Sequence, residues 1–357
     1  MESRDSQNDQ SKHKIHHIVR ASDWWDFKLS PIFAVVYATA FILQIPIASL
    51  WPLLVLILVA LVPGAAYVSV INDLTDIEDD LKSGKKNRLI GKSRTFLVFI
   101  LSLCILPGLA VAFYWRNDAL LVSLYLAAWV AFSLYSIPPA RLKSRGVLGL
   151  LADASGAHLF PTLLVIVLVF RWQQDPLDLF WLGSVAVWSL NHGLRGNLWH
   201  QLDDLRNDEQ VGIRTFARSH KIAWLHGLGN FVIFPIELAA FTLMLWRVRS
   251  QLAVAFLCIY ALLELSRKGL WKMNLVVVAP RDRYSIAMLE YYEVFFPLAL
   301  LLSSSIQHLR DTLILVAHLL LFPRRAIQIV KDIGKLVKDG VRELRLRWQR
   351  RGPLLRR

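Results

Sequence analysis

The feature that most constrains this chain is a series of apolar segments that approach the length needed to cross a lipid bilayer. A membrane-spanning helix needs about 20 mostly apolar residues. Such segments must be helical, because lipid offers the backbone no hydrogen-bond partners. We therefore expect an all-α fold, a multi-pass transmembrane helical bundle of about nine spans. The expected spans are residues 30–48, 52–71, 95–114, 119–137, 147–170, 178–194, 222–246, 252–266 and 288–307.

These segments divide the chain into three parts. Residues 1–24 are polar, residues 25–307 contain the expected spans, and residues 308–357 hold a short apolar segment followed by a basic amphipathic tail. The polar start lacks the short basic stretch and apolar core of a cleavable signal. We therefore expect the first span to direct insertion, with a cytoplasmic N-terminal segment, and a bacterial inner membrane as the location.

Charge supports the same class of protein. Apolar residues make up 55% of the chain, the mean hydropathy is +0.43 and the net charge is +14. Basic nucleic-acid-binding domains do not carry long apolar runs, so we expect no nucleic-acid partner. Lys and Arg favour the cytoplasmic loops of membrane proteins, and with the N-terminus inside, the inner loops hold 19 of them against five in the outer connections. The inner loops are residues 72–94, 135–146, 195–221 and 267–287.

The tail beyond residue 323 has an amphipathic pattern. Apolar residues recur every three or four positions among Lys and Arg, which gives one apolar stripe on a helix. The pattern is typical of a helix that lies on a membrane surface, where anionic lipid attracts basic residues. A partner-binding tail is the alternative, and the sequence leaves open whether residues 312–322 cross the membrane. The stripe consists of Ile327, Val330, Ile333, Val337, Val341, Leu344 and Trp348.

An acidic cluster follows the second expected span. If the helix continues there, Asp73, Asp76 and Asp80 stand at positions i, i+3 and i+7 on one face. Asn72 lies beside them. Converging carboxylates repel one another unless a cation holds them, and oxygen ligands favour a hard divalent ion such as Mg²⁺. We expect a Mg²⁺ site here; a solvated run of charges at a helix end is the alternative.

A second acidic cluster follows the sixth expected span. Asp204 and Asp208 stand at positions i and i+4, again on one helical face. Both clusters fall on the inner side by the charge count. Two acidic faces on one side of a bundle could flank a diphosphate bridged by Mg²⁺. The pairing of the clusters, rather than the second one alone, carries this prediction.

Basic residues lie close to both clusters. Arg88 follows the first cluster, and Arg141 and Lys143 lie in the loop between the fourth and fifth spans. Arg and Lys form charge-assisted hydrogen bonds with diphosphate oxygens. We expect these three residues, with Asn72, to bind the diphosphate of a substrate. The general excess of basic residues on the inner side is the alternative explanation for each.

Three motifs together resemble the UbiA-type intramembrane prenyltransferase family. They read NDxxDxxxD, YSxPPxRxK, and DxxxD followed by GxxT, and the resemblance covers about residues 25–307. One departure follows the first motif, where the family often has N-R-P-x-P-S-G and residues 87–93 read N-R-L-I-G-K-S. The motif residues are Asn72, Asp73, Asp76 and Asp80; Tyr135, Ser136, Pro138, Pro139, Arg141 and Lys143; and Asp204, Asp208, Gly212 and Thr215.

The resemblance implies Mg²⁺-dependent transfer of a prenyl group from an allylic prenyl diphosphate to a lipophilic, often aromatic acceptor, with release of diphosphate. It implies a bundle around a central cavity and a place in quinone or lipid biosynthesis. Tyr135 would act in catalysis by stabilising a developing allylic cation through its ring. The implied metal ligands are Asp73, Asp76, Asp80, Asp204 and Asp208, and all of these except Asp80 are also expected to be catalytic.

Four further ionisable residues are weaker candidates. Asp153 and His158 lie within the fifth span, where an ionisable group usually faces a cavity or a partner. They could bind the acceptor or remove a proton, or form a structural hydrogen bond between helices. Arg195 and His200 precede the second acidic cluster and could bind diphosphate or orient the acids.

Other functions remain to be separated from prenyl transfer. A related lipid-linked reaction, such as phosphoribose transfer from phosphoribosyl diphosphate to a polyprenyl phosphate, would use a similar scaffold. A transporter is less favoured, because transporters bury carboxylates near the bilayer midplane. The DGxxAR string of CDP-alcohol phosphotransferases does not occur. A soluble prenyl-chain synthase is excluded by the apolar spans.

Overall fold

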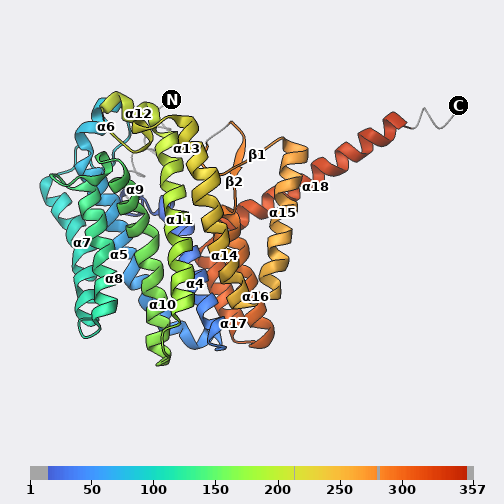
Figure 1. The fold of residues 1–357 in the computed structure, drawn as a ribbon, viewed down its shortest axis with the longest axis horizontal. Coiled ribbons are helices and arrows are strands. Elements are labelled where there is room, and N and C mark those ends of the chain that lie inside the picture. The colour runs from blue at the N-terminus through green and yellow to red at the C-terminus, as the bar shows by residue number, and fades with distance from the viewer. Residues whose placement is uncertain (1–14, 213, 280–281, 352–357) are drawn as a thin grey trace, which may run out of the picture.

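The computed structural model describes residues 15–351 except residues 213 and 280–281. Within this part nearly all regular structure is helical (Figure 1), and two short strands, β1 (Asn274–Val276) and β2 (Tyr284–Ile286), pair in parallel. The predicted all-α bundle is therefore confirmed. Residues 1–14 of the expected N-terminal segment and residues 352–357 of the expected tail lie outside the described residues.

Six helical stretches of the described chain are long and apolar enough to cross a membrane, so this is an integral membrane protein. Each stretch consists of one helix or of consecutive helices. They are α3 (Ala21–Trp24) with η2 (Trp25–Leu29) and α4 (Ser30–Ile42); η3 (Ile47–Leu50) with α5 (Trp51–Thr75); α7 (Arg94–Tyr114); α8 (Ala119–Ser136); α9 (Val147–Ala154) with η5 (Ser155–Leu159) and α10 (Phe160–Gln173); and α13 (Ile222–Leu228) with η7 (Gly229–Ile233) and α14 (Phe234–Val248).

The other three expected spans also contain helix but are more polar or shorter. They correspond to α11 (Leu179–Asp203), to α15 (Gln251–Trp271), and to η8 (Tyr291–Phe295) with α16 (Phe296–Gln307). All nine predicted segments are thus largely helical, while six, or seven if one bent pair is counted, meet the length and composition of a span among the described residues. The remaining short and C-terminal helices are α2 (Ile15–Ile18), α6 (Ile77–Ser83), η4 (Leu142–Ser144), α12 (Leu205–Val211), η6 (Ala217–Ser219), α17 (Asp311–Leu321) and α18 (Pro323–Arg351).

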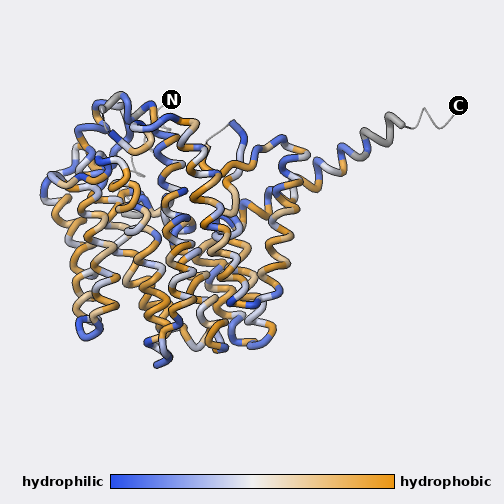
Figure 2. Tube along the Cα trace, viewed as in Figure 1, coloured by the Kyte–Doolittle hydropathy of each residue, from blue (hydrophilic) through white to orange (hydrophobic). Residues whose placement is uncertain are grey.

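Helix α4 lies in the middle of the apolar core. Its sequence is apolar on every side, which is the pattern of a helix that is covered all round, and it contacts α10, α14 and α16. The indole of the fully buried Trp181 on α11 donates a hydrogen bond of 3.0 Å to the hydroxyl of Thr39 on α4. Figure 2 shows apolar residues along the middle of the bundle and polar residues at its two ends.

Aspartates begin two of the long helices at the end of the bundle opposite the acidic clusters. Asp118 accepts backbone N–H bonds at the start of α8, and Asp178 does so at the start of α11. Each also pairs with an arginine in the last turn of another helix, Arg171 of α10 at 2.9 Å and Arg247 of α14 at 2.8 Å. Two basic residues at this end of the bundle therefore hold helix starts.

The two acidic clusters occupy equivalent breaks in two long helices. Helix α5 stops at Asp76 and α6 continues the chain, just as α11 stops at Asp204 and α12 continues it. Both short helices end at a glycine in the left-handed conformation, Gly84 at φ 70° and Gly212 at φ 74°. Helices α6 and α12 contact each other at one end of the bundle (Figure 1). The expected uninterrupted helix through Asp73, Asp76 and Asp80 is thus broken at Asp76.

The segment that the sequence left open, residues 312–322, runs back along α4. At its start, the Asp311 carboxylate accepts the N–H groups of Ile47 and Ala48 at 3.0 and 2.7 Å, beyond the end of α4. At its end, Trp25 donates to the Leu321 carbonyl at 2.6 Å. Helix α18 then departs at 85° to α17, so the tail begins at the end of the bundle where residues 22–26 lie.

Candidate active site

A cavity of about 580 Å³ opens between α4, α5, α8 and the η5–α10 segment. One end is polar and includes both acidic clusters, while the interior is apolar. Its volume is in the range of pockets that enclose small-molecule ligands. The polar lining includes Asn72, Asp73, Asp76, Asp79, Asp80, Lys85, Lys86, Arg88, Tyr135, Lys143, Asp204 and Asp208. The apolar lining includes Leu29, Ile32, Ala60, Leu61, Val68, Leu124, Phe132 and Leu164.

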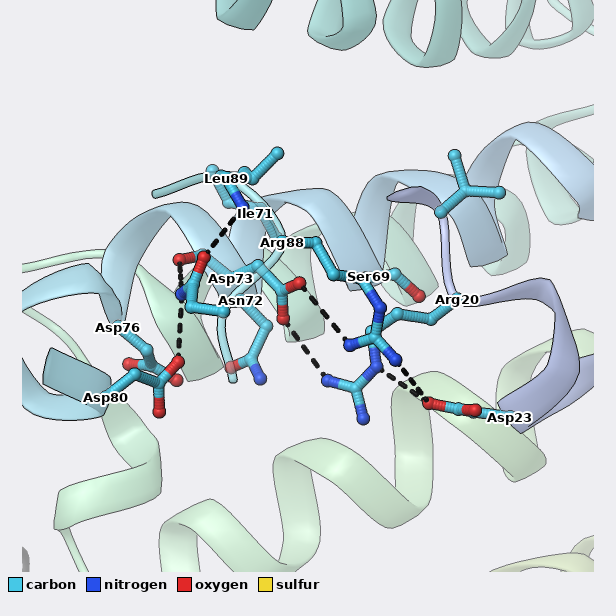
Figure 3. A network of polar contacts seen from close by, with 12 residues as sticks. Arg20, Asp23, Ser69, Ile71, Asn72, Asp73, Asp76, Asp80, Arg88 and Leu89 are labelled. Atoms are coloured by element: carbon cyan, nitrogen blue, oxygen red, sulfur yellow. Dashed lines mark hydrogen bonds and ion pairs between the residues drawn. The ribbon is translucent and has the colours of Figure 1, made fainter. Parts of the chain in front are cut away.

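Asp73 is the most buried of these acids and lies between two arginines (Figure 3). Its Oδ1 accepts a hydrogen bond from Arg20 at 3.3 Å, and its Oδ2 lies 3.9 Å from a guanidinium nitrogen of Arg88. Arg20 also pairs with Asp23 at 2.9 Å, and this second contact helps to raise the pKa of Arg20 despite burial. Oδ2 of Asp73 is buried and accepts no hydrogen bond from the described residues.

Asp76, at the break after α5, is bound by the loop that follows α8. Arg141 donates to Asp76 at 3.0 Å and to Asp79 at 2.6 Å, and Lys143 also contacts Asp76. Although burial opposes the charge of Arg141, its bonds to Asp79 and Asp76 raise its pKa. For the more buried Lys143, desolvation outweighs the attraction of Asp76 and lowers its pKa. The YSxPPxRxK loop and the first motif thus form one charged unit.

Asn87 fixes the loop after α6 to the first motif. Its side-chain amide donates to the Asp73 carbonyl at 2.6 Å and to Asp80 Oδ2 at 2.8 Å, and its carbonyl oxygen accepts the N–H of Leu89 at 2.9 Å. These bonds hold Asp80 close to Asp73 although the two acids lie on different helices. The changed sequence after Asn87 therefore leaves the anchoring function of Asn87 in place.

The second cluster faces the first across the cavity. Lys85 lies 3.2 Å from Asp204 Oδ1, which joins the loop after α6 to the break after α11. Burial and the neighbouring Asp204 raise the pKa of Asp208, and Arg218 donates to the Asp208 backbone carbonyl at 3.0 Å. A parallel β-bridge between Gly146 and Thr215 connects the loop after α8 to the segment after α12. The three motifs therefore meet at one end of the cavity.

These residues fit a Mg²⁺ ion that completes its shell with substrate. Within the described part of the chain no three acidic, His or Cys side chains already form a metal site by themselves. Asp73, Asp76 and Asp204 are instead held by arginine and lysine. Mg²⁺ is usually bound by one or two carboxylates together with substrate phosphates and water. The acidic clusters offer only oxygen ligands, and the buried Oδ2 of Asp73 accepts no hydrogen bond from the described residues. Both features suit a Mg²⁺ ion held by a few carboxylates.

The weaker sequence candidates divide into two pairs. Asp153 and His200 line the cavity. His158 does not; its ring packs edge-on against His192 with centroids 5.1 Å apart. Arg195 is fully buried outside the cavity lining, where it makes two hydrogen bonds of 2.7 Å to Glu237 on α14. Of the expected diphosphate ligands, Asn72, Arg88 and Lys143 line the cavity, and Arg141 reaches it through Asp76 and Asp79.

Several lining residues were not predicted from the sequence. Arg20, Asp23 and Lys28 come from the start of the first span, and Asn197 and Gln201 precede the second cluster on α11. Gln201 is fixed by bonds to Asn197 at 2.7 Å and from the Ala217 N–H at 3.0 Å. The spacing of Asn197, Gln201 and Asp204 on one helical face was the available signal. Nothing local marks Arg20, because its contact with Asp73 depends on the tertiary fold.

Comparison with known proteins agrees with this architecture. No family model matches the chain, and no curated protein matches it in sequence. The structure is similar to that of a UbiA homolog from Archaeoglobus fulgidus bound to GPP and Mg²⁺, with a TM-score of 0.52 and 13% identity over 84% of this chain and 99% of that chain. A second structure, of a UbiA homolog from the same organism bound to DMAPP and Mg²⁺, aligns with 91% of this chain and 99% of that chain at a TM-score of 0.48 and 14% identity.

The class of protein is therefore an intramembrane helical bundle with an acid-lined cavity. More particularly, its fold is that of a UbiA homolog. The resemblance that the three sequence motifs suggested is confirmed at the level of the fold.

Proposed function

We propose that this protein is a Mg²⁺-dependent prenyltransferase that moves a prenyl group from an allylic prenyl diphosphate to a lipophilic, often aromatic acceptor within the membrane. One observation carries the proposal. Two acidic clusters from distant parts of the chain line one end of a cavity whose interior is apolar. A prenyl diphosphate has the same division into a charged head and an apolar tail. The similar fold of a UbiA homolog bound to GPP and Mg²⁺ supports the assignment.

The acidic and basic residues at the polar end of the cavity have separate roles in this proposal. Asp73, Asp76, Asp80, Asp204 and Asp208 would hold Mg²⁺, which neutralises the diphosphate and stabilises it as a leaving group. Arg88, Lys143 and Asn72 would bind diphosphate oxygens directly. Arg20 and Lys85 would add positive charge from opposite sides of the site, one beside Asp73 and the other beside Asp204. Such fixed charges stabilise developing negative charge without reorganising during the reaction.

The apolar interior would exclude water from the carbon that loses diphosphate. Phe132, Tyr135 and Tyr67 line the cavity, and the faces of aromatic rings attract positive charge. Tyr135 is therefore our candidate for stabilising the allylic cation. Exclusion of water matters because hydrolysis would compete with attack by the acceptor. Asp153 and His200, which also line the cavity, are candidates for binding the acceptor or accepting its proton.

Helix α18 supports the further proposal that the tail contacts anionic lipid. One side of the helix is bound to the bundle: Asp332 accepts from Arg267 at 2.6 Å, and Leu336 is buried. The predicted apolar stripe lies on another side and is exposed, with Val330 at 68% and Val337 at 61%. Basic residues flank the stripe, as expected of a helix at an anionic surface. The side chains of Leu344 and Trp348 lie outside the described part of the structure.

The orientation is part of the same proposal. We expect the cavity mouth, the N-terminal segment and the start of α18 to face the cytoplasm of a bacterial cell, with the bundle in its inner membrane. The basic loops at this end support that orientation through the positive-inside rule. The hydrogen bonds of Arg324 to Ser22 at 3.2 Å and to Asp26 at 3.1 Å support placing the tail on the same side.

The experiment that tests the function is diphosphate release by the purified protein. Geranyl to long-chain prenyl diphosphates are offered with a panel of aromatic acceptors, with and without Mg²⁺. We expect Mg²⁺-dependent release that increases with one acceptor and is lost in Asp204→Asn. Asp203→Asn is the matched control, because Asp203 is exposed next to Asp204 and does not line the cavity. Consumption of phosphoribosyl diphosphate instead would favour the lipid-linked sugar reaction, and inactivity with every donor would overturn both.

A further inference from the structure

One indole ring closes the apolar part of the cavity toward α7. Trp129 on α8 lines the cavity, and its ring lies 4.9 Å from the ring of Tyr67 and 6.0 Å from that of Tyr125, between centroids. The Tyr67 hydroxyl is hydrogen-bonded to Ser133 at 2.8 Å, and the Tyr125 hydroxyl donates to the Ala60 carbonyl at 3.0 Å. The indole is thus held between two tethered rings.

The ring has glycines rather than side chains behind it. A methyl group on Gly108 of α7 would lie 2.5 Å from Cζ2 of Trp129, far inside van der Waals contact. A methyl group on Gly64 of α5 would lie 3.6 Å from the ring, at an ordinary contact distance. Gly108 is therefore needed for the observed position of the indole. Because glycine has no side chain, neither residue would fill the space that the indole leaves if it were removed.

We infer that Trp129 limits the length of the prenyl chain that the cavity accepts, an inference that rests on the proposed function. Asn72 at the polar end and Ala60 at the apolar end both lie on α5, about 18 Å apart at the rise of an α-helix. Gly64 lies between them and faces Trp129. A chain that enters from the acids therefore passes Phe132 and meets the indole before it reaches Tyr125. Without the indole, the cavity would extend toward Gly108.

Two substitutions at the indole should shift the preferred length of the prenyl donor in opposite directions. Trp129→Ala removes the ring and should shift the ratio of kcat/KM values toward longer prenyl diphosphates by about tenfold, the effect typical of reshaping an apolar pocket by one or two groups. Gly108→Ala pushes the ring toward the cavity and should shift the ratio toward shorter donors. The controls are Trp51→Ala, an exposed tryptophan, and Gly183→Ala, a helical glycine whose methyl would meet open space.

The test measures diphosphate release for allylic donors of increasing length and, independently of turnover, calorimetric binding of the corresponding thiolodiphosphates. Trp129→Phe, which keeps a smaller ring, should give an intermediate profile and serves if the alanine variant does not fold. If the wild-type protein neither binds nor consumes any prenyl diphosphate, the proposed function fails. If it does, and the three variants keep the wild-type length profile, the role of Trp129 is overturned while the function stands.

Discussion

Lys85 and Asp204 join the two acidic clusters directly, with 3.2 Å between Nζ and Oδ1. Lys85 belongs to the loop that follows α6, and Asp204 forms the break between α11 and α12. The two halves of the polar end of the cavity are therefore in direct contact. A diphosphate between the clusters would contact Lys85 here, and the negative charge of the diphosphate would pair with the positive charge of the lysine.

Replacing Lys85 by Ala should weaken substrate binding more than it affects folding. A partly exposed ion pair contributes at most ~1 kcal/mol to stability, so the melting temperature should change little. Loss of a cation at the mouth should raise the KM for prenyl diphosphate by about tenfold, in keeping with a charge-assisted bond. Steady-state diphosphate release measures this, with Lys82→Ala as the control because Lys82 is exposed outside the cavity lining. Equal KM values for Lys85→Ala and wild type would contradict the assignment.

Stability and kcat should depend on both the charge and the size of the side chain at position 87. Asn87→Ala leaves the Asp73 carbonyl and Asp80 Oδ2 without their donor, which should cost ~1–3 kcal/mol of stability and lower kcat. Asn87→Asp should be worse than alanine, because it adds a carboxylate beside Asp80. Thermal unfolding in detergent and kcat for diphosphate release are the two measurements. An aspartate variant that matches wild type would show that Asn87 does not organise the first motif.

The buried pair Arg195–Glu237 should be a major structural contact. Glu237→Met leaves Arg195 charged inside the bundle, and breaking a buried pair in this way typically costs ~3–5 kcal/mol. The double variant Arg195→Met with Glu237→Met removes both charges and should recover most of that loss. Unfolding in detergent of Arg195→Met, of Glu237→Met and of the double variant gives the coupling free energy between the two residues. Additive losses would mean that the two residues do not stabilise each other.

The exposed stripe of α18 should lie in the membrane interface. Lipid contact is measured by quenching of a fluorophore attached to Val330→Cys in a Cys258→Ser background, because Cys258 is the exposed cysteine. Nitroxide-labelled lipid should quench the probe strongly, and more so when the vesicles contain anionic lipid. Lys331→Cys is the control, since it projects about 100° away from Val330 around the helix. Equal quenching at both sites would argue for a tail in solution.

The sequence was sufficient to predict that two acidic clusters lie at the same end of the bundle. The spacing of Asp73, Asp76 and Asp80 and the charge asymmetry of the loops together indicated two acidic clusters at one end. This prediction was possible because the helical period and the charge of the loops depend only on residues that are close in sequence. The helix breaks also left a signal: Gly84 follows Asp76, and Gly212 follows Asp204, at the same spacing.

Contacts between distant elements could not be predicted in the same way. Arg20 reaches Asp73 because the N-terminal segment lies beside the end of α5, and no pattern near residue 20 specifies that position. Arg195 lies only nine positions before Asp204 in the chain, but it bonds to Glu237 on α14 and lines no part of the cavity. Both outcomes depend on how helices pack, which the spacing within one helix does not determine.

The central claim is that the two acidic clusters together bind the diphosphate of a prenyl donor and the apolar interior binds its chain. The most direct measurement is an experimental structure of the full chain with Mg²⁺ and geranyl thiolodiphosphate, a donor analogue that does not readily lose its diphosphate. The diphosphate should lie between Asp73 and Asp204, with the chain extending past Phe132 toward Trp129. A headgroup that contacts neither acidic cluster, or a chain outside this cavity, would contradict it.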